Sequence, residues 1–571
     1  MMKLVKHVSK GAVVSALVFL VIQVGCTLYL PYLTAKMVNQ GILQGDIGFI
    51  WSQGRLMLGL TAVSLIAAYL NTVIAAKVSF NFGNRLRELM YQKVLSFSKE
   101  DYDHFGTSTL ITRNITDVSQ VQNLLSMFLK FLVLAPLYLI GGITLTYMLS
   151  PKLAFIFIAV LPFLFVAAIV VHKIANPLYE KMQRTIDRLN GIFREGLTGV
   201  KVIRAFNQEK LEEQKYQESN EAYQTYSIKA GTIMSAFIPF ISLLMNVTTL
   251  VVLWVGSHDV VNGISEIGSI MAVLTYSGQI LMGFGILTSV ILAVPKGQVS
   301  AKRLNNVLQM PNEVAEKKDA IDQDVSEGLV LDKVNFSYPG ASKGVLEQVS
   351  LKVQAGQTLA IIGGTGGGKS TLLNLLNRQY EPTNGMIYWQ KQVLSTLEKY
   401  RLNELMSITP QKATLFRGTI RSNLLLANEK ASDAELWQVL ALAQANEFVL
   451  QLPKGLDSQV EAGGDNFSGG QKQRLCIART LLKEAEVYLF DDSFSALDFK
   501  TDRAIRHSLK VKLANKLTVI VAQRINTIIE ADVIVVLDQG KVVGTGTHQA
   551  LLATNKVYQE IVKSQQEEVA A

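Results

Sequence analysis

The chain has 571 residues, of which 49% are hydrophobic and only 18% are charged. A soluble globular protein carries about 25% charged residues, so the composition argues against a wholly soluble protein. The net charge of +9 does not indicate nucleic-acid binding, because the basic residues are spread along the chain and form no patch with aromatic residues. Two cysteines, Cys26 and Cys476, are too few for a disulfide framework or a cysteine-based metal site.

Apolar stretches long enough to cross a bilayer, which takes about 20 residues, recur through the first half of the chain. There are six, at residues 12–33, 56–76, 127–149, 153–171, 232–256 and 267–294. One such stretch could be a buried helix of a soluble protein, but six in series predict a membrane domain. The first follows a basic N-terminal segment without a persuasive cleavage site, so we expect a membrane helix and not a cleaved signal peptide.

The connections between these spans alternate between short and long. The long connections, at residues 77–126 and 172–231, hold the basic residues that flank the spans. The positive-inside rule therefore places both long loops and both termini in the cytoplasm. Apolar residues at helical spacing within 176–205 predict that the spans continue as a helical stalk. Pro295 is expected to end the sixth span.

The pattern changes at residue 329, where short β-rich runs begin to alternate with helical stretches. The runs are 329–336, 358–362, 487–490, 518–521 and 533–537. This alternation predicts an α/β domain with a mainly parallel sheet. We therefore expect a transmembrane domain of residues 1–295, a polar linker of residues 296–328 and a soluble domain of residues 329–571.

A phosphate-binding P-loop is indicated by residues 363–370, which match the pattern G-x-x-x-x-G-K-[ST] between a predicted strand and a helical run. Its glycines let backbone N–H groups surround phosphate oxygens at a helix N-terminus. Lys369 is expected to reach the β- and γ-phosphates and Ser370 to bind Mg²⁺, so the expected ligands are ATP and Mg²⁺. The expected nucleotide contacts are Gly363, Gly364, Thr365, Gly366, Gly367, Gly368, Lys369, Ser370 and Thr371.

A carboxylate follows the apolar run 487–490 directly, at Asp491. The carboxyl ends of parallel strands meet at one edge of a sheet, beside the P-loop. Asp491 is therefore expected to hold Mg²⁺ together with Ser370, as in P-loop enzymes generally.

A third motif points to a family. Residues 466–474 read Asn-Phe-Ser-Gly-Gly-Gln-Lys-Gln-Arg, which resembles the LSGGQ signature of ABC transporters with Phe467 in place of leucine. Tyr338 resembles the aromatic residue that stacks on adenine, Gln411 the Q-loop glutamine, and residues 495–498 the D-loop. With its membrane-first order and two long cytoplasmic loops, nearly the whole chain resembles a type IV ABC half-exporter. The resemblance implies a membrane α-helical bundle of six transmembrane helices fused to an α/β P-loop NTPase domain, embedded as a multi-pass protein in a bacterial cell membrane.

The resemblance also implies a partner. In this family two nucleotide-binding domains pair head to tail, and each ATP lies between one P-loop and the other domain's signature. The resemblance also implies that Gln411 is a Mg²⁺ ligand and a catalytic residue of this chain's own site. Segments 101–107 and 206–213 resemble the family's coupling helices. The implied partners are a second ABC half-transporter, membrane lipids and hydrophobic small molecules. The signature residues expected to contact ATP are Ser468, Gly469, Gly470 and Gln471.

Two catalytic positions, Asp492 and Gln523, depart from the family pattern. At the first position the family has Glu, the base that polarises the attacking water. The side chain of Asp492 is one methylene shorter, so its carboxylate falls short of that place, and a misplacement of about 1 Å can cost about 10²-fold in rate. The family has His at the second, where it contacts the γ-phosphate, and the amide of Gln523 can donate a hydrogen bond but cannot take up a positive charge. These changes beside an intact P-loop predict a site that binds ATP and hydrolyses it slowly. Such a site resembles the degenerate half of heterodimeric bacterial multidrug exporters.

The transported substrate is not identified by the spans. Aromatic and Met residues in spans five and six suit apolar contacts, but they are also ordinary residues of membrane helices. Hydrophobic, drug-like substrates are expected chiefly from the resemblance to multidrug pairs. The alternatives are a lipid or peptide exporter or flippase of the same architecture, a homodimeric exporter that uses Asp492 as its base, and a non-transporting channel regulator or sensor.

Overall fold

The computed structural model describes residues 9–311, 328–341 and 343–570. The chain divides into two compact units. The first unit consists of Met1–Leu95 and Ser108–Met310, and the second of Ser96–Thr107 and Pro311–Ala571. The short segment Ser96–Thr107 therefore belongs with the C-terminal domain, although it lies between two membrane helices in the sequence.

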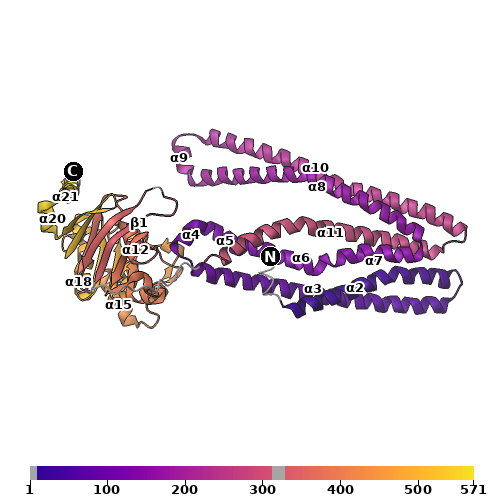
Figure 1. Cartoon of the computed structure of the whole chain (residues 1–571), viewed down its shortest axis with the longest axis horizontal. Helices are drawn as coiled ribbons and strands as arrows, with labels where there is room; N and C mark the ends of the chain where they lie inside the picture. The colour runs from indigo at the N-terminus through magenta and orange to yellow at the C-terminus, as the bar shows by residue number, and fades with distance from the viewer. Residues whose placement is uncertain (1–8, 312–327, 342, 571) are drawn as a thin grey trace. The chain divides into compact units, whose positions relative to one another are not determined.

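The first unit is entirely helical in its described part (Figure 1). Six helical segments of the described residues are long and apolar enough to cross a membrane, which confirms the predicted bundle. Their component helices are α2 (Lys10–Lys36) with η1 (Met37–Ile42), α3 (Ile47–Leu95), α5 (Thr107–Thr112) with η2 (Arg113–Asp117), α6 (Val118–Met127), η3 (Phe128–Leu132) and α7 (Leu134–Leu149), α8 (Pro151–Thr198), α10 (Glu209–Val261) and α11 (Ile267–Leu308).

Three of these helices, α3, α8 and α10, run for 49, 48 and 53 residues. About 20 residues suffice for a bilayer, so each helix continues well beyond its apolar span, as the stalk prediction required. Helices α8 and α10 lie side by side, joined by the short helix α9 (Val200–Ala205) (Figure 1). The expected coupling segment 206–213 does not form a short helix of its own. The short helix between α8 and α10 is α9, and α10 already begins at Glu209 within the expected segment. Its coupling role stays a prediction.

The sixth membrane helix does not end at Pro295, contrary to the sequence prediction, but runs on to Leu308. Proline removes one backbone hydrogen bond and crowds the preceding turn. Packing on both sides of Pro295 offsets that loss, because Val290 before it and Leu304 after it are buried. The first part of the expected linker 296–328 is therefore helical, and residues 312–327 lie outside the described residues.

The second unit is built on a six-stranded sheet in the order β12-β11-β3-β10-β9-β6, counted over the described residues. The pairings among β11, β3, β10, β9 and β6 are parallel, and only β12 is antiparallel. This confirms the predicted α/β domain and four of its predicted strands. The bounds are β3 (Thr358–Gly363), β6 (Met406–Thr409), β9 (Val487–Asp491), β10 (Leu517–Val521), β11 (Val533–Asp538) and β12 (Lys541–Gly546).

The fifth predicted strand, β1 (Leu329–Phe336), forms as predicted but lies in a different sheet. It pairs antiparallel with β2 (Leu346–Val353) and β4 (Asn384–Trp389), and β5 (Gln392–Val393) completes a four-stranded sheet in the described chain. Local alternation of apolar residues predicts a strand but carries no information about its partner, which is why the sequence did not separate the two sheets.

The remaining elements of the second unit are short. They are α4 (Lys99–Phe105), α12 (Lys369–Leu376), η4 (Leu394–Thr396), α13 (Lys399–Leu405), β7 (Gly418–Thr419), α14 (Ile420–Leu425), α15 (Asp433–Leu442), α16 (Asn446–Leu450), η5 (Gly455–Asp457), β8 (Gln459–Val460), η6 (Ala462–Gly464), α17 (Gly469–Leu482), α18 (Phe499–Lys512), α19 (Ile525–Ile528), α20 (His548–Thr554) and α21 (Lys556–Ala570).

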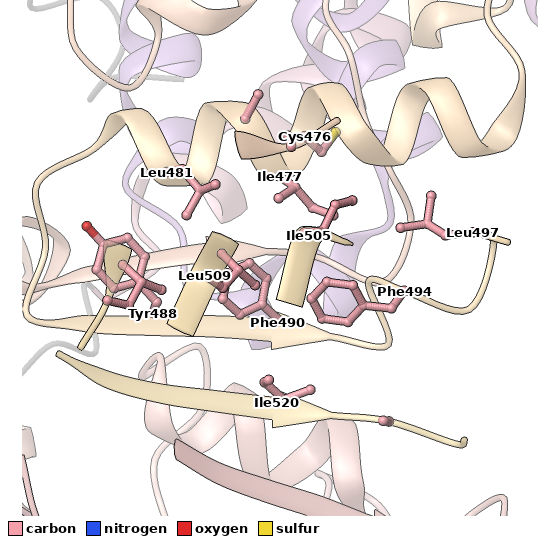
Figure 2. Packing of buried hydrophobic residues seen from close by; sticks show 14 of the residues in the cluster. Cys476, Ile477, Leu481, Tyr488, Phe490, Phe494, Leu497, Ile505, Leu509 and Ile520 are labelled. Atoms are coloured by element: carbon pink, nitrogen blue, oxygen red, sulfur yellow. The ribbon is translucent and has the colours of Figure 1, made fainter. Parts of the chain in front are cut away.

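An apolar cluster joins α17 and α18 to the central sheet (Figure 2). Ile477 and Leu481 come from α17, Ile505 from α18, and Phe490 from β9, and all four are buried. Burial of each such side chain contributes about 1.5–3 kcal/mol. The cluster thus fixes the start of α17 and the end of β9, where the predicted functional residues lie, in one packed body.

Candidate nucleotide-binding site

The P-loop runs from the end of β3 to the start of α12 and requires glycine at particular positions. A Cβ at Gly363 would lie 2.0 Å from the carbonyl oxygen of Leu537 on β11. Gly368, which caps α12, has a φ of +94° in the left-handed region. Glycine alone adopts that conformation without strain, and the resulting turn directs backbone N–H groups toward one point at the helix N-terminus.

Lys369 folds back over this loop. Its Nζ donates hydrogen bonds to the carbonyl oxygens of Gly363 and Gly364, both at 2.8 Å. Burial lowers the pKa of the Lys369 ammonium, and the carboxylates of Asp492 and Asp491 act in the opposite direction. A cation on a glycine-rich loop at a helix N-terminus suits a phosphate chain.

Two of the three predicted Mg²⁺ ligands, Ser370 and Asp491, are in contact. Ser370 Oγ donates a hydrogen bond of 3.1 Å to Oδ1 of Asp491, the buried last residue of β9. Burial raises the pKa of Asp491, and the hydrogen bond from Ser370 lowers it in part. A hydroxyl and a carboxylate are the hard oxygen donors that Mg²⁺ takes. No group of three or more His, Cys, Asp or Glu in the described chain could hold a metal alone, so Mg²⁺ here would depend on phosphate oxygens as well.

The Tyr338 ring, the predicted adenine contact, lies in an aromatic cluster. Its centroid is 4.9 Å from that of Phe336 and 5.3 Å from that of Tyr380, both edge-on. Its hydroxyl is 3.0 Å from Oγ1 of Thr371 on α12, so the ring is tied to the same helix that the P-loop begins.

Tyr380 was not predicted from the sequence. Its hydroxyl donates a hydrogen bond to Oδ2 of Asp103 on α4, 277 positions away in the sequence. Burial raises the pKa of Tyr380, and the Asp103 carboxylate raises it further. No local pattern could have indicated a contact over that separation. The bond ties α4, which contains most of the expected coupling segment 101–107, to the aromatic cluster.

The two positions that depart from the family pattern contact each other. Gln523 Nε2 donates a hydrogen bond of 2.9 Å to Oδ2 of Asp492. The backbone of Asp492 is left-handed, with a φ of 47°, and its N–H donates to the carbonyl oxygen of Val521 at 2.9 Å. Burial raises the pKa of Asp492, and a hydrogen bond from the exposed Gln411 is among the contacts that lower it. The structure thus brings the three expected catalytic side chains together.

The signature residues begin α17, as predicted. Ser468 is the N-cap, its Oγ accepts a hydrogen bond from the Gln471 N–H at 3.3 Å, and Gln471 Oε1 accepts from the Ser468 N–H at 3.0 Å. Gly469 and Gly470 form the first turn, whose N–H groups have no partner within the helix. Within the described part of the chain, none of these side chains bonds to a P-loop residue.

Known proteins match nearly the whole chain. The family model described as "ABC transporter transmembrane region" matches residues 13–284, and the one described as "ABC transporter" matches residues 346–495. An uncharacterized ABC transporter ATP-binding protein of Mycobacterium tuberculosis is 35% identical over 94% of this chain and 93% of its own length. A "probable multidrug resistance ABC transporter ATP-binding/permease protein" of Bacillus subtilis is 29% identical over 93% of this chain and 92% of its own.

A solved structure has the same architecture. The structure of a bacterial Atm1-family ABC exporter with ATP bound is 25% identical, with a TM-score of 0.82 over 97% of this chain and 98% of that one. The chain therefore belongs to the ABC transporter family. It is a half-transporter of the exporter kind, with a multi-pass membrane domain and an ATP-hydrolysing domain.

Proposed function

We propose that this chain is one half of a heterodimeric ABC exporter of hydrophobic, drug-like molecules. Its own P-loop site retains ATP and hydrolyses it slowly, and its signature completes the active site of the partner. The observation that carries the proposal is the hydrogen bond between Asp492 and Gln523, the two positions at which the family pattern is lost.

ATP retention is assigned to the intact parts of the site. Tyr338 stacks on adenine, the P-loop N–H groups and Lys369 bind the phosphates, and Ser370 and Asp491 hold Mg²⁺. When bound, Mg²⁺ neutralises charge on the β- and γ-phosphates. The ammonium of Lys369 uses two of its three N–H donors on the carbonyl oxygens of Gly363 and Gly364, and a bond to phosphate, in which both partners are charged, is stronger than either.

Slow hydrolysis follows from the geometry of Asp492. Its backbone is held by Val521, so the chain cannot advance to offset the shorter side chain. One carboxylate oxygen of Asp492 already accepts a hydrogen bond from the amide of Gln523. This amide stays neutral, so it cannot offer the positive charge that a histidine would bring to the site. Misplacement of the base by about 1 Å is worth about 10²-fold in rate.

The signature, intact except for Phe467, serves the second half-transporter. Ser468 and the first turn of α17 present donors at a helix N-terminus, where a γ-phosphate bound to another P-loop is stabilised. Helix α9 also fits a partner, because no α9 residue is buried and the neighbouring Phe206 is 72% exposed. Both loops and both termini are cytoplasmic by the positive-inside rule, and lipid surrounds the spans. The multidrug assignment is supported by the Bacillus subtilis relative, which is described as a probable multidrug resistance transporter.

The double substitution Asp492→Glu with Gln523→His tests this function in the purified chain. When the chain pairs with itself, each P-loop faces the intact signature, so a deficient partner signature cannot mask a gain. Steady-state phosphate release in lipid nanodiscs is expected to rise by roughly 10²-fold, since the base regains its reach.

The control adds Ser468→Arg to the double variant and is expected to remove the gain. A wild-type chain that already turns over as fast as the double variant contradicts the proposal and favours a homodimer that uses Asp492 as its base.

A further inference from the structure

The C-terminal helix α21 reaches the loop that carries Gln523. The side chain of Gln565 makes two hydrogen bonds to the backbone of this loop, on either side of Arg524. Its Nε2 donates to the carbonyl oxygen of Gln523 at 2.6 Å, and its Oε1 accepts from the N–H of Ile525 at 2.8 Å. The side-chain amide of Gln565 thus donates one hydrogen bond to the loop backbone and accepts another from it, as the backbone of a neighbouring β-strand would.

The bond to Ile525 has a specific physical reason. Ile525 is the first residue of α19, a helix of only one turn, and the first N–H groups of a helix have no partner within it. The N-cap, Arg524, makes no side-chain cap hydrogen bond. Gln565 therefore supplies, from a distant part of the chain, the acceptor that a capping side chain would give.

A second anchor of the loop is the side chain of Arg524. Its Nη1 donates to the carbonyl oxygen of Leu497 at 3.3 Å, and its guanidinium lies 5.4 Å from the ring centroid of Phe499. Beside the loop lies a cavity of about 760 Å³, lined in part by Phe499, Gln523 and Gln565. Because this part of the loop borders a cavity, the two hydrogen bonds from Gln565 are a direct restraint on its backbone there.

We infer that Gln565 is a positioning residue, which acts through the loop backbone to aim the side chain of Gln523 at the γ-phosphate position. Asp492 Oδ2 accepts a hydrogen bond from Gln523 Nε2, so a restraint on the Gln523 loop also fixes the position of this hydrogen bond in the proposed slow site. The inference rests on the proposed function and on the family resemblance, which implies that the side chain at position 523 contacts the γ-phosphate of ATP. Without Gln565 the loop keeps its fold but Gln523 samples more directions.

The experiment compares Gln565→Ala with the wild-type full chain in nanodiscs, by titration with Mg-ATP and with Mg-ADP. The preference for ATP over ADP is expected to fall by about tenfold, the size of the loss of one or two hydrogen bonds. Affinity for ADP is expected to stay within about twofold, because ADP lacks the γ-phosphate that the Gln523 side chain would contact. A merely structural role would weaken both nucleotides alike and would overturn the inference.

Two further variants complete the test. Gln566→Ala removes the same type of side chain from the next, exposed position of α21 and is expected to leave the preference unchanged. Gln565→Ala is expected to have no further effect in a Gln523→Ala background, since it acts through that residue. An additive effect of the two substitutions, or an equal effect of Gln566→Ala, overturns the inference. Rapid hydrolysis by the wild-type chain instead counts against the proposed function.

Discussion

Replacing Ser468 by arginine is expected to lower the ATP turnover of the assembled transporter by at least about 10²-fold, whereas Asp492→Asn changes it by less than about twofold. The arginine side chain fills the space in front of α17 that the γ-phosphate of ATP bound to the partner must occupy. The Asp492 site contributes little to turnover. Phosphate release by the purified heterodimer in nanodiscs measures both variants.

The control for Ser468→Arg is Ser432→Arg. Ser432 also caps a helix, α15, and forms the same reciprocal capping box, there with Glu435. Loss of either cap costs about 1 kcal/mol of stability, so the two variants are matched in structural damage. Equal turnover of the two variants, or a large loss on Asp492→Asn, would show that this chain's P-loop side is the productive one.

Lys369→Ala is expected to weaken Mg-ATP binding to this chain by about 10²-fold or more, because charge-assisted hydrogen bonds contribute about 1.5–3 kcal/mol each. The melting temperature is expected to change little, since the two bonds that Lys369 makes without nucleotide go to the carbonyl oxygens of the loop itself. Titration calorimetry on the full chain measures the affinity.

Lys510→Ala provides the matched control for Lys369. Lys510 is exposed and pairs with Glu530 at 3.6 Å on the surface of α18, so its loss is expected to leave nucleotide affinity unchanged. Retention of Mg-ATP by Lys369→Ala at wild-type affinity would contradict the assignment of the P-loop as the ATP site.

Much of the fold could be predicted because its signals are local. Long apolar runs define membrane helices without reference to the rest of the chain. The P-loop positions need glycine because larger residues do not fit: a Cβ at Gly363 would lie 2.0 Å from the carbonyl oxygen of Leu537. Proline is a weaker signal. Pro295 ends a helix in isolation, but packing on both sides carries α11 past it.

The parts that could not be predicted depend on contacts between distant residues. Three contacts join segments far apart in the chain, and no local sequence pattern indicates them. They are the antiparallel pairing of β1, the hydrogen bond from Tyr380 to Asp103 and the hydrogen bonds of Gln565 to the Gln523 loop. The sequence showed that Asp492 and Gln523 both depart from the family pattern. Only the structure shows that they bond to each other, so that one substitution provides the partner of the other.

The most direct measurement of the central claim is the fate of Mg-ATP on the purified wild-type chain without a second half-transporter. Radiolabelled ATP is bound, free nucleotide is removed, and the bound ATP and ADP are followed over time with and without hydrophobic drugs. We predict that ATP stays bound and intact over many minutes and that drugs do not accelerate its loss. Rapid, drug-stimulated conversion to ADP, or no retained nucleotide, would contradict the account.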